Sequence, residues 1–362
     1  MFILLSAIFF FIILRFVVSL FNFLSDPKLR RVVKPYHHVV SILIPARNEE
    51  ANIIALLQSI QQQDYQDYEV VVLDDGSTDS TYRLCQEFAV NRPKFSVIKG
   101  DPLPPDWLGK NYACYQLAQQ ARGEFLLFLD ANTTIENSLI NSAIHRIHLK
   151  NLGLLSIFPN QEMRSIGEWA MVPLMHYILL NLLPLQLVYL LRNRIISAAS
   201  GQFMLFTAAT YHQHQWHREV KQKVVEDVEI MRLVKVAGYN GETLLANNFV
   251  NSRMYRGYAE AMNGFSKNIL AAFNYNVFSL LIFLIILLGG PLIIIATLNL
   301  NLIVMMCGLI ILSRIMISLS AGQSAWKNVL LHPLQMLSLM LIAFLAIQRY
   351  LTRTTVWKGR RV

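Results

Sequence analysis

The sequence predicts an α/β protein whose mostly parallel, doubly wound sheet is flanked by membrane helices at both ends of the chain. Strand-like apolar runs alternate with helical segments from residue 39 to residue 129. Long apolar stretches cover residues 2–24 and most of residues 277–350. Of the 362 residues, 54% are apolar and only 15% are charged, which is too apolar for an ordinary soluble enzyme.

The formal net charge of +9 raises the question of a nucleic-acid partner. No long Lys/Arg run alternates with aromatic residues, so we expect no nucleic acid and instead attraction to an anionic membrane surface or a phosphorylated substrate. The three cysteines, Cys85, Cys114 and Cys307, are too widely spaced for a metal motif or a disulfide framework. Their pattern favours a reducing compartment for the part of the protein outside the membrane.

Residues 1–25 are predicted to form an N-terminal transmembrane anchor. The apolar run has only four polar interruptions, at Ser6, Arg15, Ser19 and Asn22. A cleaved signal peptide is the alternative, but no charged segment precedes the run and no small-residue cleavage site closes it. Basic residues follow directly, at Lys28, Arg30, Arg31 and Lys34. The positive-inside rule therefore places the next segment in the cytoplasm.

The expected sheet is built from short apolar strands with helices between them. We expect strands at residues 39–45, 70–73, 95–99, 124–129 and 200–206. We expect helices at residues 52–62, from the Ser77-Thr78-Asp79 cap to about residue 89, at 111–120, and from Glu226 to about residue 237.

Residues 68–81 contain the strand and acidic turn that indicate where the ligand site of the predicted sheet lies. The run Val70–Leu73 reads as a strand buried on both faces, and it stops at Asp74, Asp75 and Gly76. Two carboxylates therefore stand at the carboxyl end of a parallel strand, where open α/β sheets bind ligands. The alternative is an ordinary surface turn that uses Asp as a turn former.

Four motifs in order resemble glycosyltransferase family 2, whose GT-A fold transfers sugars from nucleotide-sugar donors. Ser-Ile-Leu-Ile-Pro-Ala-Arg-Asn-Glu-Glu at 41–50 resembles its opening strand, and Val-Val-Val-Leu-Asp-Asp-Gly-Ser-Thr-Asp at 70–79 its nucleotide-binding strand end. Gly-Glu-Phe-Leu-Leu-Phe-Leu-Asp-Ala-Asn at 123–132 is similar to the strand before its metal-binding Asp-x-Asp. Val-Val-Glu-Asp-Val-Glu-Ile at 224–230 resembles the motif that carries its catalytic base.

Within that family, the closest resemblance is to membrane-bound enzymes that glycosylate carotenoids or related polyisoprenoid lipids. It rests on Trp-Leu-Gly-Lys at 107–110, Gly-Gln-Phe-Met-Leu-Phe at 201–206 and the terminal apolar segments. The resemblance implies that Asp75 binds the base of the donor nucleotide, as an acceptor-only carboxylate can. It also implies a set of further substrate-binding residues, namely Pro45, Arg47, Glu49, Lys110, Asp130, Gln202 and Glu226.

Lys110 would neutralise the donor diphosphate, although a solvated surface lysine is the alternative. The resemblance assigns a divalent metal, Mg²⁺ or Mn²⁺, to Asp130 and Asn132. The second position is an amide here instead of a carboxylate, so we expect a weaker site in which Asp130 and the donor phosphates hold most of the ion. An inactive, degenerate site is the alternative.

Asp227 is the expected general base, with Glu226 as its neighbour in the motif. The helix dipole would lower the pKa of Asp227 and burial would raise it. Two acidic residues that merely stabilise the start of a helix are the alternative. Arg253 and Arg256 stand where relatives carry Gln-x-x-Arg-Trp. The Gln and Trp are missing, which argues against a processive polysaccharide synthase. The resemblance therefore carries over only to Arg256, with Arg253 as its partner, as residues that bind the substrate. An interfacial anchor is the alternative interpretation of both arginines.

The remaining apolar segments raise two questions. Residues 171–191 are interpreted as a membrane-dipping segment or a buried helix, because a full span would separate Asp75 from Asp227. Residues 277–298, 302–319 and 330–347 would place the basic C-terminal residues outside, against the positive-inside rule. We therefore expect one of them to be re-entrant, with Gly289–Pro291 marking the first. His212, His214 and His217 are expected to be surface histidines and not metal ligands.

The predicted domains are the anchor at 1–25, a GT-A domain at 36–260 and a C-terminal transmembrane region at 277–350. The predicted protein is a multi-pass enzyme of the cell membrane with a cytoplasmic catalytic domain. It would transfer one sugar, with inversion, from a UDP- or GDP-sugar to a carotenoid or similar isoprenoid lipid. One alternative acceptor is a polyprenyl phosphate, hopanoid or glycerolipid, and one alternative function is an inactive scaffold that binds nucleotide sugar.

Overall fold

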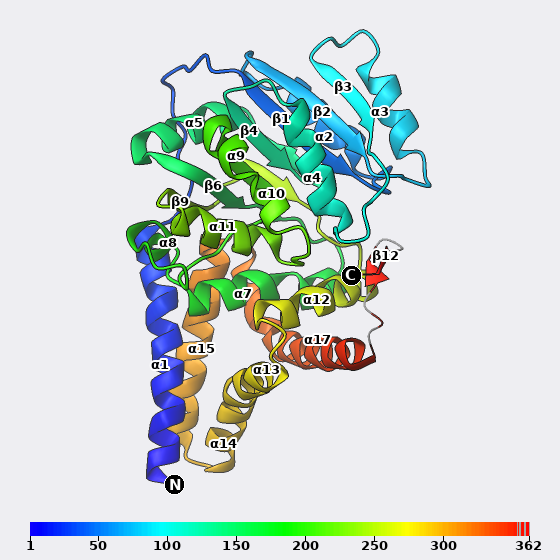
Figure 1. Cartoon of the computed structure of the whole chain (residues 1–362). Helices are drawn as coiled ribbons and strands as arrows, with labels where there is room; N and C mark the ends of the chain where they lie inside the picture. The colour runs from blue at the N-terminus through cyan, green and yellow to red at the C-terminus, as the bar shows by residue number, and fades with distance from the viewer. Residues whose placement is uncertain (353, 355, 358–359, 362) are drawn as a thin grey trace. The chain divides into compact units, whose positions relative to one another are not determined.

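The computed structural model describes residues 1–352, 354, 356–357 and 360–361 (Figure 1). The chain forms two compact units. We call Pro27–Asn160 with Leu185–Arg253 the sheet unit, and Met1–Asp26, Gln161–Pro184 and Met254–Val362 the helical unit. Within the range 36–260 predicted for the catalytic domain, residues 161–184 and 254–260 thus fall in the helical unit. Arg353 and Lys358, part of the basic C-terminal segment, lie outside the described residues.

The sheet unit contains a seven-stranded sheet of order β3-β2-β1-β4-β8-β6-β9. Its strands are β1 (Val40–Ala46), β2 (Tyr68–Asp74), β3 (Phe95–Lys99), β4 (Phe125–Leu129), β6 (Leu152–Phe158), β8 (Phe203–Thr207) and β9 (Asn240–Leu245). Strands β3, β2, β1 and β4 are parallel, whereas β8 is antiparallel to both of its neighbours. The predicted mostly parallel sheet is confirmed.

The register of these strands gathers their polar ends at one edge. Ala46 pairs with Asp74 at the ends of β1 and β2, and Leu43 pairs with Phe128 near the end of β4. Because β8 runs the other way, its first residue, Phe203, pairs with Leu129 at the end of β4. The loop before β8 therefore lies at the same edge as the carboxyl ends of the parallel strands.

Helices cover the sheet where the apolar pattern demands burial. They are α2 (Ile53–Gln61), α3 (Thr81–Ala89), α4 (Gly109–Gln120), α5 (Leu139–Lys150), α8 (Gln186–Leu190), α9 (Ala208–His214), α10 (Trp216–Glu219) and α11 (Glu226–Val236). One core joins the central strands to α2 and α5 through residues such as Ile42, Leu56 and Ile144. A separate small ladder pairs β5 (Thr133–Ile135) with β10 (Val250–Ser252), while β7 (Asn160–Gln161) leads out of the unit.

The helical unit holds the long apolar helices. Its elements are α1 (Phe2–Ser25), α6 (Ile166–Met171), α7 (Pro173–Leu182), α12 (Tyr258–Ala272), α13 (Val277–Leu284), the π-helical turn η1 (Ile285–Gly289), α14 (Gly290–Ala296), α15 (Leu300–Ser320), α16 (Ala325–Leu330), α17 (His332–Thr352) and the short strands β11 (Val356–Trp357) and β12 (Arg360–Arg361). Among the described residues, four helical stretches are long and apolar enough to cross a membrane: Phe2–Ser25, Val277–Ala296, Leu300–Ser320 and His332–Thr352.

The predicted membrane-dipping segment at 171–191 is divided between the units, because α7 belongs to the helical unit and α8 to the sheet unit. No stretch of it is among the candidate spans found in the described residues. Its membrane contact stays a prediction.

The polar interruptions of the N-terminal anchor have a structural reason. Arg15, Ser19 and Asn22 are buried on one face of α1. Arg15 donates from Nη2 to the Tyr177 hydroxyl at 2.6 Å, and the Ser19 hydroxyl donates to Oδ1 of Asn181 at 2.9 Å. Asparagine and serine side chains commonly join apolar helices in this way. The three residues therefore bind α1 to α7 and do not interrupt the helix.

Candidate active site

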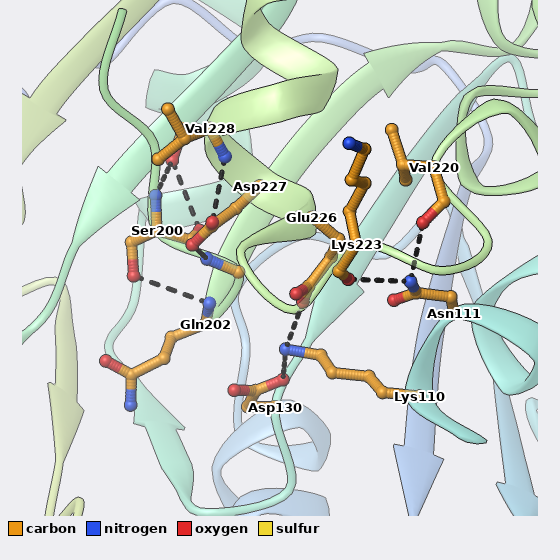
Figure 2. A network of polar contacts seen from close by, with 12 residues as sticks. Lys110, Asn111, Asp130, Ser200, Gln202, Val220, Lys223, Glu226, Asp227 and Val228 are labelled. Carbon is orange, nitrogen blue, oxygen red and sulfur yellow. Dashed lines mark hydrogen bonds and ion pairs between the residues drawn. The ribbon is translucent and has the colours of Figure 1, made fainter. Parts of the chain in front are cut away.

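Three charged side chains meet at the edge where the parallel strands end (Figure 2). The ammonium of Lys110, at the start of α4, lies 2.8 Å from Oδ1 of Asp130 and 3.1 Å from Oε1 of Glu226. Asp130 directly follows β4, and Glu226 begins α11. The sequence-predicted residues Lys110, Asp130 and Glu226 are therefore one cluster, although 116 positions separate the first from the last.

The cluster perturbs the proton affinities of its members. Burial would lower the pKa of Lys110, but the carboxylates of Asp130 and Glu226 outweigh it and hold that pKa well above its usual value. Burial raises the pKa of Asp130, with smaller contributions from the negative charges of Glu226 and Glu49, while Lys110 opposes the shift. Perturbed pKa values in a cluster of charged groups are typical of functional sites.

Asp227 lies beside this cluster and is held by backbone groups. Its Oδ2 accepts a hydrogen bond from the Gly201 amide at 2.8 Å, and its Oδ1 accepts one from the Val228 amide at 2.8 Å (Figure 2). Burial and the charge of Glu226 raise the pKa of Asp227 to about 7, against the opposing effect of Lys110. Burial, one of the two effects considered from the sequence, is thus the largest cause of this raised pKa.

Gly201 is required by crowding at this site, a role that the sequence did not reveal. A Cβ atom there would stand 2.8 Å from the Lys110 ammonium and 3.1 Å from Oε1 of Glu226. Small residues in a predicted strand, such as Ser200 and Gly201, often mark a close approach of the backbone to another group, and this is the signal that could have indicated the crowding. Asn111 was also missed. Its buried amide donates to the Val220 carbonyl at 2.8 Å and the Lys223 carbonyl at 3.0 Å, which fixes the chain that leads into α11 (Figure 2).

The expected nucleotide-binding residues form the neighbouring part of the same edge. Arg47 donates from Nη1 to the carbonyl of Asp75 at 2.5 Å and to that of Gly76 at 3.0 Å. The Asp75 amide donates to the Ala46 carbonyl at 2.8 Å. Gly76 has φ +66°, so a residue without a Cβ suits this turn. Pro45 stands next to these residues, paired with Leu73 across β1 and β2.

The two predicted metal ligands lie on one loop that Gln202 braces. The Asp130 amide donates to the Gln202 carbonyl at 3.3 Å, and Gln202 donates from Nε2 to Oδ1 of Asn132 at 3.4 Å and to the Ser252 hydroxyl at 2.7 Å. No group of three or more His, Cys, Asp or Glu side chains arranged for a metal occurs among the described residues. Two hard oxygens with one charge fit Mg²⁺ or Mn²⁺ when a diphosphate supplies further oxygens.

Two predictions about other residues have different outcomes. Arg253 ends the sheet unit and Arg256 belongs to the helical unit, so their role in substrate binding stays a prediction. The expectation of surface histidines is wrong for His217. This side chain is buried against Phe128, with ring centroids 4.8 Å apart, and its Nδ1 lies 2.6 Å from the Tyr211 hydroxyl. Burial lowers the pKa of His217 to about 3, so it is neutral.

Comparison with known proteins shows the fold and a resemblance to one sequence family. A mannosyltransferase from Pyrobaculum calidifontis, solved in complex with GDP-Man and Mn²⁺, aligns with 96% of this chain and 99% of its own, at a TM-score of 0.57 and 16% identity. The likeness shows the fold, which is GT-A. Residues 41–206 match the sequence model described as Glycosyl transferase family 2. Residues 41–206 are therefore similar to glycosyl transferase family 2.

Two curated relatives share this sequence pattern. The 4,4'-diaponeurosporenoate glycosyltransferase of Staphylococcus haemolyticus is 28% identical over 235 residues, which cover 64% of this chain and 60% of the relative. The protein of that name from Staphylococcus aureus is 29% identical over 243 residues, which cover 64% of this chain and 61% of the relative. The chain thus spans about three fifths of the length of these relatives.

Proposed function

We propose that this protein is a glycosyltransferase that moves one sugar from a UDP- or GDP-sugar to a membrane lipid, a carotenoid or similar isoprenoid, at the cytoplasmic face. The observation that carries the proposal is the cluster of Lys110, Asp130 and Glu226 beside Asp227 at the carboxyl edge of the sheet. The names of the two staphylococcal relatives support an isoprenoid acceptor. The GDP-Man of the Pyrobaculum protein supports a nucleotide-sugar donor.

The donor half of the site would use the turn after β2. Asp75 accepts a hydrogen bond from the nucleotide base, and Arg47 keeps the turn in place through the carbonyls of Asp75 and Gly76. Glu49 and Pro45 complete this side of the crevice. Lys110 exchanges part of its contact with Asp130 and Glu226 for the diphosphate, since a compact ammonium suits phosphate oxygens.

Asp130 and Asn132 are the residues that would hold Mg²⁺ or Mn²⁺. A bound divalent ion supplies charge stabilisation for the departing nucleoside diphosphate. Gln202 keeps the Asn132 oxygen and the Asp130 backbone in one arrangement through its hydrogen bonds. Since only one of the two ligands is charged, the diphosphate contributes much of the affinity of the site for the ion.

The transfer step would use Asp227 as the general base. With a pKa of about 7, its carboxylate is ionised in part of the molecules at neutral pH and is basic enough to accept a hydroxyl proton. Attack of the acceptor oxygen on the anomeric carbon, from the face opposite the nucleotide, inverts the configuration and releases the nucleoside diphosphate. Gly201 and Val228 hold the carboxylate in position.

The decisive experiment uses membranes that contain the full chain and a radiolabelled UDP- or GDP-sugar. Transfer of label into an organic extract, lost in Asp130→Ala and identified by mass spectrometry, would support the proposal. The same analysis distinguishes an isoprenoid from a polyprenyl phosphate, hopanoid or glycerolipid acceptor. Asn132 is the one observation that favours an inactive scaffold. Donor binding without transfer to any lipid extract would establish that second function and refute the first.

A further inference from the structure

The last long apolar helix, α17, is fixed along α12. Near the start of both helices, the hydroxyls of Tyr258 and Ser338 lie 3.1 Å apart. Farther along both helices, Arg349 of α17 donates to the Ser266 hydroxyl at 2.8 Å and to Oδ1 of Asn263 at 2.6 Å, both in the middle of α12. The later residue of α17 thus contacts the later residues of α12, so the two helices run side by side in the same direction. They must therefore share one orientation toward the bilayer.

Helix α12 is unsuited to cross a bilayer. Its 15 residues rise only about 22 Å, whereas a hydrocarbon core is about 30 Å thick. It carries Glu260, Asn263 and Lys267, and it is not one of the four candidate spans. An amphipathic helix of this kind lies in the plane of the interface. Because α17 runs side by side with α12, α17 also lies in the plane of the interface.

The other candidate spans pack against one another. Ile8 and Ile12 of α1 form a cluster with Ile294 of α14 and Met306 of α15. A Cβ atom on Gly290 would stand 3.0 Å from Cγ2 of Ile8, so the glycine allows α14 to approach α1 closely. Figure 1 shows α1 and α15 side by side, with α12 and α17 lying across their direction. The helical unit thus contains a spanning group and a transverse pair.

The glycine-proline sequence expected to mark re-entry does not break its helix. The stretch from Val277 to Ala296 continues through the π-helical turn η1, directly before Gly290 and Pro291. A π-helical turn is a known way to keep a helix continuous where the regular ladder is disturbed. The helical segment that departs from the spanning direction is instead α17.

The outward face of α17 suits lipid and not water. Five exposed apolar side chains follow one face, namely Leu334, Leu337, Leu341, Phe344 and Leu351. The opposite face buries Gln335 and Ser338 together with Leu339 and Ile342. An exposed apolar stripe of this length requires a cover. The acyl chains just below the headgroups, continuous with the lipid around α1 and α15, supply it.

We propose that α12 and α17 form an interfacial lipid-binding platform, and that the chain crosses the bilayer three times. The crossings are α1, the helix Val277–Ala296 and α15, so the chain after α15 returns to the side that carries the sheet unit. This places Arg349 next to anionic headgroups and satisfies the positive-inside rule. The inference rests on the proposed membrane location and is independent of catalytic activity.

Depth measurements on spin-labelled full-length protein test the platform. Single cysteines replace Leu334, Leu341 and Leu351 on α17, in a Cys307→Ser background where Cys85 and Cys114 are buried. The matched controls are Val304, Ile311 and Leu319 on α15, all exposed. Accessibility to oxygen and to a nickel chelate is compared in vesicles of phosphatidylglycerol and phosphatidylethanolamine. We expect one common depth along α17, and a maximum at Ile311 on α15.

A spanning α17 would give a different profile. Leu334 and Leu351 are about 26 Å apart along the axis, so Leu341 would then lie roughly 10 Å deeper than the nearer end. That result would overturn the proposal. If the labels on both α17 and α15 showed no contact with lipid, the membrane location itself would be refuted. A protein that failed to transfer sugar would still give the same label depths. The two failures are therefore distinguishable.

The side of the membrane on which the chain lies after α17 can be determined in a second, independent test. Single cysteines at Leu298, Thr354 and Asp101 are labelled with an impermeant maleimide in intact and in permeabilised cells. Leu298 lies in the exposed turn between α14 and α15, and Asp101 is exposed on the sheet unit. We expect Thr354 to be labelled together with Asp101. Labelling of Thr354 together with Leu298 would mean a fourth crossing and would overturn the proposal.

Discussion

Replacing Asp227 by Asn removes a base while nearly preserving shape. The carboxylate accepts two backbone hydrogen bonds, from Gly201 and Val228, each at 2.8 Å. The single amide oxygen of Asn can keep one of them, and the other backbone N–H loses its acceptor at a cost of about 1–3 kcal/mol, below the ~5–15 kcal/mol stability of a typical domain. General-base catalysis is worth about 10²–10⁴-fold in rate. With a hydroxyl acceptor, we therefore expect kcat to fall by about that factor and donor affinity to change little.

The pH profile makes this expectation specific. A base must be deprotonated, and the pKa of Asp227 is about 7, so wild-type kcat should rise as pH increases through 7. The Asn variant should lack that rise. Burial and then the charge of Glu226 raise this pKa, so Glu226→Gln should move the rise to lower pH and reduce turnover less than Asp227→Asn does.

The assay is sugar transfer in vesicles over pH 5.5–8.5, with donor affinity measured by calorimetry. Glu229→Gln is the matched control, because Glu229 lies on the same helix and its carboxylate forms an ion pair with Arg232. Turnover of Asp227→Asn at the wild-type rate would refute the assignment. If kcat of Asp227→Asn still rose with pH as it does in the wild type, the titrating group would be a residue other than Asp227.

Three further outcomes are expected. Asp75→Ala should weaken binding of a nucleoside diphosphate in calorimetry, whereas the control Asp101→Ala, at an exposed position, should not. If Asp75→Ala bound the nucleoside diphosphate as tightly as the wild type, Asp75 would be excluded from the site. Asn132→Asp should tighten Mn²⁺ binding because it adds a charge at a hard-cation ligand, and full wild-type activity in excess chelator would contradict the metal assignment. Gly201→Ala should displace the Lys110 ammonium, because that group would otherwise stand 2.8 Å from the new Cβ. Turnover should fall while Tm stays unchanged. Turnover at the wild-type rate would show that the contact of Lys110 with Asp130 is dispensable.

The sheet was predictable from the sequence because its signals are local. A short β-branched run that ends in Asp-Asp-Gly defines β2 and its turn without reference to any other part of the chain. The same holds for β4 and for Gly238, which follows α11 with φ +87° as expected of a helix stop. The parallel arrangement then requires that the ends of these strands share one edge, so Asp75 and Asp130 stand at the same edge of the sheet.

The contacts that the sequence did not reveal depend on distant residues. Nothing near Lys110 indicates that its ammonium contacts Glu226, because α4 and α11 meet only in the folded protein. His217 looked like a surface residue in a polar stretch, but Phe128 and Tyr211, from other elements, enclose it. The polar residues of α1 likewise find Tyr177 and Asn181 on a helix about 160 positions away. Local patterns define elements, and burial decides the roles of their polar residues.

The acceptor determines how much of the rate Asp227 supplies. A lipid hydroxyl is a poor nucleophile until its proton is removed, so a neighbouring base with a pKa of about 7 contributes directly to the transition state. A carboxylic acid, with an ordinary pKa of roughly 4, is already ionised at neutral pH and needs no base. With a carboxylate acceptor, the rate should therefore depend weakly on Asp227 and strongly on Lys110, which assists departure of the diphosphate. The ratio of the losses caused by Asp227→Asn and Lys110→Gln thus reports the chemical class of the acceptor before its structure is known.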